Sequence, residues 1–291
     1  MHRRRIATLA RFATMGLGVT FGLYFVLTSP FQHDPLWLVW APLVIAFTSS
    51  AGAVFLYGIT RWTELTRSAE THVSIRDAAI RVTPIGIVII FVLAWSPWLP
   101  APMHFTLRFA TLIAIPLLGG ITAAGAMEGI RQVATRQSAD RTRGGQAALV
   151  ISLRQLLQRL LAALGSLVAL STLALGPSVN LLRKLAENPH FRVHQLPPQF
   201  VLVFGGLGSL LVAFYYAPAA TAVQRCGQEL CNDLFPLAGA DDAATILTVA
   251  GDRHKLEQLL AVDRGVAADL QTGLVILGPF LASAATAFLS P

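Results

Sequence analysis

The residues best suited to bind a metal ion are four histidines that lie between the apolar stretches of the chain: His33, His104, His190 and His194. His190 and His194 are four residues apart, the spacing that brings two imidazoles to one face of a helix, where they can share a metal. Asn188-Pro189 stands directly before this pair, and proline disfavours the helix that would align it. We therefore predict no metal site and no cofactor.

Two cysteines, Cys226 and Cys231, are the next candidates for chemistry. A separation of five residues on one helix turns the second side chain about 140° away from the first. At that angle the two sulfur atoms can neither bond to each other nor share a metal easily. We predict two reduced thiols with a structural role.

The apolar stretches contain no ionisable side chain. Asp, Glu, Lys, Arg and His are all absent from six runs: 12–29, 36–60, 82–98, 109–127, 160–176 and 199–223. Acid–base catalysis and proton relays need such groups, so we predict no catalytic residues and no enzyme. The hydroxyls of Thr48, Ser49 and Tyr215 offer a polar path instead, but in apolar helices such groups usually bond to the backbone of their own helix.

The composition identifies the kind of protein that these runs build. Of the 291 residues, 54% are hydrophobic and 13% are charged, whereas soluble domains have about 25% charged residues. The six runs are long enough to cross a bilayer. We predict an all-α, polytopic transmembrane bundle with six spans in residues 1–223. Residues 272–291 form a seventh apolar helix, which is transmembrane or re-entrant. The second alternative arises because Gly278-Pro279 interrupts the helix.

The basic residues set the predicted orientation. With the N-terminus in the cytosol, eighteen arginines and lysines fall on the inner side and four on the outer side. The positive charge therefore reads as a topology signal, and no nucleic acid is predicted as a partner. Only two of the 22 basic residues are lysines, which is typical of a GC-rich bacterial genome. We predict a multi-pass protein of the bacterial inner membrane with a cytoplasmic N-terminus.

Small residues recur every fourth position in two of the predicted membrane helices. The sixth run contains Gly205, Ser209, Ala213 and Ala217, and the last segment contains Gly278, Ala282 and Thr286. Such stripes let two helix backbones approach closely, so we predict that these two helices pack together. The pair Gly18 and Gly22 predicts close packing of the first helix in the same way.

The inner segments differ in charge. Residues 224–271 carry eight acidic against four basic residues, whereas the loop after the fourth run carries the arginines Arg131, Arg136, Arg141 and Arg143. This contrast favours docking of the acidic cytosolic segment on the basic loop. The arginines of the loop could also bind anionic lipid headgroups. Within 224–271, a breaker at 235–239 precedes a helix that we expect Asp252 to cap. Residues 146–160 form an amphipathic helix that lies on the membrane surface or continues into the fifth span.

These observations lead to two functional hypotheses. The first is a non-enzymatic interaction or scaffold protein, whose partners are the bilayer and, through residues 224–271, its own bundle, a second copy or another protein. The alternative is an oligomeric channel, pore or facilitator for a small solute or lipid, because uncharged walls suit gating by dewetting.

Overall fold

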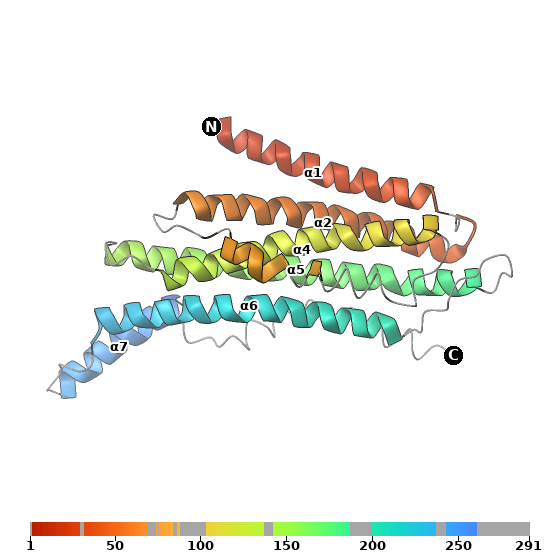
Figure 1. Cartoon of the computed structure of the whole chain (residues 1–291). Helices are drawn as coiled ribbons and strands as arrows, with labels where there is room; N and C mark the ends of the chain where they lie inside the picture. The colour runs from red at the N-terminus through yellow and green to blue at the C-terminus, as the bar shows by residue number, and fades with distance from the viewer. Residues whose placement is uncertain are drawn as a thin grey trace.

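The computed structural model describes residues 2–29, 32–68, 74, 76–83, 86–87, 103–136, 142–186, 199–236 and 243–260. Within these ranges every regular element is an α-helix, as predicted (Figure 1). The named helices are α1 (His2–Leu27), α2 (Pro35–Ser68), α4 (Met103–Thr135), α5 (Arg143–Ala186), α6 (Gln199–Leu234) and α7 (Ala243–Leu260). Residues 76–83, which we call helix 76–83, and residues 86–87 are also helical.

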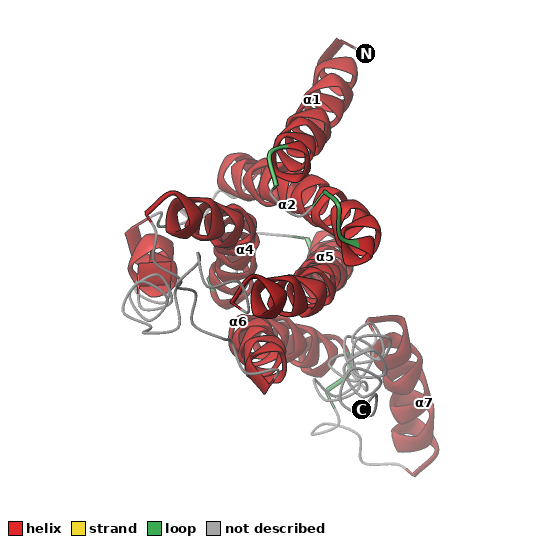
Figure 2. Ribbon diagram, turned by 90° about the vertical axis from the view of Figure 1, so that its right-hand side faces the viewer, coloured by secondary structure: helices red, strands yellow, loops and turns green. Residues whose placement is uncertain are grey.

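Four helices, α2, α4, α5 and α6, lie alongside one another and form the bundle. Helix α2 packs on α4 and α5, and α6 packs on the same two helices from the other side (Figures 1 and 2). Helix α1 packs on the outer side of α2, and α7 packs on α6 and α5. Helices α2, α4 and α6 end, and α5 begins, at one end of the bundle, which we call the charged end (Figure 1).

Three of the described helices are long and apolar enough to cross a membrane: Pro35–Arg67, Arg143–Leu181 and Phe204–Leu234. A shorter apolar helix covers Ala13–Leu27. The fold is therefore compatible with a membrane protein, although these three candidates are fewer than the six spans predicted. Most of the predicted span 82–98 and the whole of the predicted helix 272–291 lie outside the described residues.

The helices extend further than the apolar runs that predicted them. Helix α5 has 44 residues, which corresponds to about 66 Å, roughly twice the thickness of a bilayer core. Of the two alternatives for residues 146–160, the structure has the continuous helix. Helix α6 passes residue 223 unbroken and ends at Leu234, directly before the predicted breaker. The predicted cap at Asp252 is wrong, because α7 begins nine residues earlier, at Ala243.

The start of α2 shows how the sequence fixes a helix end. The Asp34 carboxylate accepts a hydrogen bond from the backbone N–H of Leu36 at 2.9 Å, which satisfies a donor that the first turn leaves free. Pro35 then occupies the first helical position, where no N–H is needed.

The main core lies toward the charged end. Its fully buried side chains include Met127 and Ile130 of α4, Leu157 and Leu160 of α5, and Tyr216 of α6. A second, smaller cluster joins α1, α2 and α5 and includes Val26, Trp40, Val44, Ala174 and Leu181. The two clusters hold the helices together near both ends of the bundle.

Trp40 gives a direct test of the second cluster. Its indole Nε1 donates to the Ser178 hydroxyl of α5 at 2.7 Å, and its side chain is 5% exposed. Replacing Trp40 with phenylalanine should lower the free energy of unfolding by about 1 kcal/mol, because a partly buried interhelical hydrogen bond is lost. The measurement is unfolding by SDS titration in detergent micelles. Adding Ser178→Ala to Trp40→Phe should cost little more, and fully additive losses would show that this bond contributes nothing.

Candidate functional site

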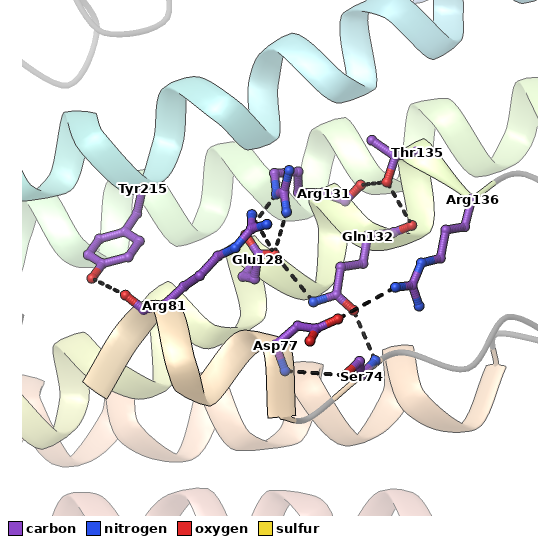
Figure 3. A network of polar contacts seen from close by, with 9 residues as sticks. All are labelled: Ser74, Asp77, Arg81, Glu128, Arg131, Gln132, Thr135, Arg136 and Tyr215. Carbon is purple, nitrogen blue, oxygen red and sulfur yellow. Dashed lines mark hydrogen bonds and ion pairs between the residues drawn. The ribbon is translucent and has the colours of Figure 1, made fainter. Parts of the chain in front are cut away.

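Glu128 is the one charged residue that is buried among the side chains the structure describes. It lies on α4 directly after the apolar run 109–127, and its side chain is 9% exposed. Arg131 donates from Nε to Glu128 Oε2 at 2.8 Å and from Nη2 to Oε1 at 2.7 Å. Oε1 also accepts from Arg81 Nη1 at 3.2 Å and from Gln132 Nε2 at 3.3 Å (Figure 3). The carboxylate is thus enclosed by four hydrogen bonds.

Two elements bring these groups together. Helical spacing on α4 places Arg131 and Gln132, three and four residues after Glu128, on the same face as the carboxylate. Helix 76–83 supplies Arg81 from outside α4. We call the nine residues drawn in Figure 3 the Glu128 cluster: Ser74, Asp77, Arg81, Glu128, Arg131, Gln132, Thr135, Arg136 and Tyr215.

Three further contacts connect helix 76–83 to its neighbours. The backbone N–H of Ser74 donates to Gln132 Oε1 at 2.9 Å, and the Ser74 hydroxyl in turn accepts from the N–H of Asp77 at 3.2 Å, as an N-cap does. Asp77 forms an ion pair with Arg136 at 3.6 Å. The Tyr215 hydroxyl of α6 donates to the backbone carbonyl of Arg81 at 3.5 Å. The cluster therefore joins three elements of the bundle.

Burial dominates the electrostatics of Glu128 and raises the pKa of its carboxyl. The hydrogen bond from Gln132 and the positive charge of Arg81 oppose this shift, and the charge of Asp77 adds to it. The charged carboxylate is thus costly to bury, and it depends on the two guanidinium groups for compensation. Those groups reach water, because the Arg131 and Arg81 side chains are 25% and 54% exposed.

The cluster is better suited to joining helices than to catalysis. In the described part of the chain, the groups that bond to Glu128 are two guanidiniums and a carboxamide, and none of them exchanges a proton near neutral pH. A bidentate guanidinium–carboxylate pair instead fixes two side chains in one geometry.

The four arginines predicted to form a docking loop have different environments. Arg131 bonds to Glu128, and Arg136 pairs with Asp77, so both are engaged within the bundle. Arg143 is the first residue of α5, and Arg141 lies outside the described residues.

The predicted helix-packing stripe is described only on α6. Gly205 is buried, and Ser209, Ala213 and Ala217 are half-buried. Its predicted partners, Gly278, Ala282 and Thr286, lie outside the described residues, so the pairing stays a prediction.

Two of the three hydroxyls considered for a polar path bond to the backbone of their own helix, whereas that of Tyr215 bonds to the carbonyl of Arg81. Thr48 is fully buried and donates to the carbonyls of Val44 and Ile45 at 3.0 and 3.1 Å, and Ser49 donates to Ile45 at 2.6 Å. For Thr48 and Ser49, this backbone bonding indicates a structural role rather than a polar path.

The cysteines are unpaired, as predicted, and both are buried in α6. Within the described ranges, no three His, Cys, Asp or Glu side chains come together in a way that would hold a metal ion. His190 and His194 lie outside those ranges.

Glu128 was not among the predicted site residues, because it follows the fourth apolar run in a segment that was interpreted as a charged inner loop. A usable signal was present. Glu128, Arg131 and Gln132 follow the fourth apolar run without a helix breaker, at the spacing that makes them neighbours on a continuing helix. The contribution of Arg81, 47 residues away, had no such signal.

No protein-family model, curated protein or solved structure matches this chain.

Proposed function

We propose that the protein is a non-enzymatic membrane scaffold whose C-terminal cytosolic segment docks on the helical bundle and serves as its interaction module. The observation that carries this proposal is the burial of Leu260. This last residue of α7 is 1% exposed and belongs to the main core cluster of the bundle, whereas its neighbour Leu259 is 66% exposed. Leu256, one turn earlier, packs against the same cluster.

The docking is apolar rather than electrostatic. Of the ion pairs that the structure records, those of α7 lie within the helix itself: Arg253 with Glu257 at 2.8 Å, and Lys255 with Asp252 at 2.9 Å. Arg253 and Glu257 lie close enough to Cys231 of α6 to influence it electrostatically. The charge contrast that suggested docking on the basic loop is therefore secondary to the contact of leucines with α5 and α6.

The membrane placement is part of the same proposal. We propose six spans and a seventh apolar helix in a bacterial inner membrane, with the charged end and the N-terminus in the cytosol. The unequal distribution of arginines supports this orientation. Helix α2 ends and α4 begins at opposite ends of the bundle (Figure 1), which supports a further crossing between them. Exposed leucines such as Leu38, Leu118 and Leu210 suit contact with lipid.

A thiol-labelling experiment tests the docking of α7, because Cys231 is fully buried in the helix on which α7 packs. In a Cys226→Ser background, Leu260→Asp should speed maleimide labelling of Cys231 about 100-fold, since a carboxylate in the core displaces the helix. The adjacent variant Leu259→Asp is the matched control and should label at the rate of the parent. Equal rates in the two variants would overturn the docking proposal.

The channel alternative is decided by flux. Proteoliposomes that carry the purified full-length chain should be as tight to ions and small dyes as protein-free liposomes. Flux above that level would replace the scaffold with a pore or facilitator. The backbone bonding of Thr48 and Ser49 supports the tight outcome, because it leaves fewer hydroxyls to line a path.

A further inference from the structure

We propose that the Arg81–Glu128 ion pair is a releasable latch, that is, a contact that holds helix 76–83 against the end of α4 and can open. Loss of this pair would free the helix from α4 while the rest of the bundle stays folded. The inference does not depend on the docking of α7.

Within residues 76–83, only two small apolar side chains are buried. They are those of Ala78 and Val82, each 4% exposed, whereas the largest apolar side chain, Ile80, is 58% exposed. Polar contacts must therefore supply much of the attachment of this helix.

The three polar contacts between this helix and α4 differ in strength. Asp77 and Arg136 are 3.6 Å apart and about half exposed, so water and salt weaken their attraction. The bond from the Ser74 N–H to Gln132 joins two neutral groups. The Arg81–Glu128 pair, at 3.2 Å, is the one that involves a buried carboxylate, where a charge-assisted hydrogen bond is strongest.

Glu128 also supports the second contact. The Gln132 carboxamide donates to Glu128 Oε1 and accepts from the Ser74 N–H, so the carboxylate orients the group that holds the helix N-terminus. Two of the three contacts therefore depend on Glu128. Because the backbone carbonyl of Arg81 accepts a hydrogen bond from the Tyr215 hydroxyl of α6, release of the helix would remove a contact with α6 as well.

The test is hydrogen–deuterium exchange of the full-length protein in lipid nanodiscs. Glu128→Gln should speed exchange of the amides in 76–83 about tenfold, and clearly more than in α4 and α5. Asp77→Asn, which removes the exposed pair, is the matched control and should change exchange in 76–83 by less than about twofold. Unchanged exchange in Glu128→Gln would overturn the latch. An equal increase throughout the bundle would also overturn it, because Glu128 would then support the whole fold.

A second variant tests whether Glu128 acts through Arg81. Arg81→Gln should speed exchange in 76–83 as much as Glu128→Gln does, and the double variant should add little. Additive effects of the two substitutions would show that Glu128 does not act through Arg81.

Discussion

Replacing Arg131 with glutamine should destabilise the protein by about 3 kcal/mol near neutral pH, more than replacing its partner Glu128 with glutamine. The two members of the pair differ in access to water. Arg131 is 25% exposed and can be hydrated when its partner is lost, but Glu128 is 9% exposed and cannot. Glu128→Gln removes the buried charge together with the pair, so we expect a cost of about 1 kcal/mol.

The pH dependence should distinguish the two variants. Burial already raises the pKa of Glu128 in the native protein, and loss of Arg131 should raise it further. A group whose pKa is higher in the folded than in the unfolded state loses stability as the pH rises through the folded value. The deficit of Arg131→Gln relative to the native protein should therefore be larger at about pH 8 than at about pH 5. Glu128→Gln has no carboxyl at this position, so its stability advantage over Arg131→Gln should shrink or reverse toward acid.

Unfolding by SDS titration at the two pH values measures both effects. Arg154→Gln is not a suitable control, because that side chain is partly buried; Arg67→Gln, at the exposed last turn of α2, is the better one. Equal deficits for Arg131→Gln and Glu128→Gln at both pH values would mean that Glu128 is hydrated in the native protein.

The helical class followed from the sequence, because uncharged runs of about 20 residues have one stable form in lipid. The helix ends did not follow from those runs. Hydropathy marks where lipid-compatible residues stop, whereas a helix stops where capping and breakers stop it. Residues 143–159 contain three arginines, which end an apolar run, but no proline that would end the helix, so α5 includes them. The sequence also predicted a helix start at Asp252, directly after Gly251, but α7 continues through this glycine.

Only the local contacts of the Glu128 cluster could be predicted from the sequence. The contacts of Glu128 with Arg131 and Gln132 are local and follow from helical spacing. The contacts of the cluster that involve Ser74, Asp77 and Arg81 depend on how residues 74–83 pack against α4, which no periodicity in the sequence encodes. The docking of α7 shows the same division. An apolar stripe of Leu256, Leu259 and Leu260 is readable from the sequence, but only the packing shows that Leu260 is buried and Leu259 is not.

The second large effect is expected at Gly58 of α2, which lies against the backbone of α4. A Cβ at this position would lie 2.6 Å from the carbonyl carbon of Thr122 and 2.8 Å from the amide nitrogen of Ala123. Backbone atoms cannot move aside as a flexible side chain can. Gly58→Leu should therefore separate the two helices and lower the free energy of unfolding by about 3 kcal/mol.

Gly120 of α4 provides the matched control, because a Cβ there would meet nothing within 4 Å. Gly120→Leu should leave stability unchanged or raise it by up to about 1 kcal/mol, since leucine favours the helix more than glycine does. The readout for both variants is the SDS concentration at half-unfolding. Equal midpoints would mean that α2 and α4 can separate by the width of a side chain without loss. A large difference would show that small residues at helix crossings hold this bundle, as Gly18 and Gly22 also do where α1 meets Thr48 of α2.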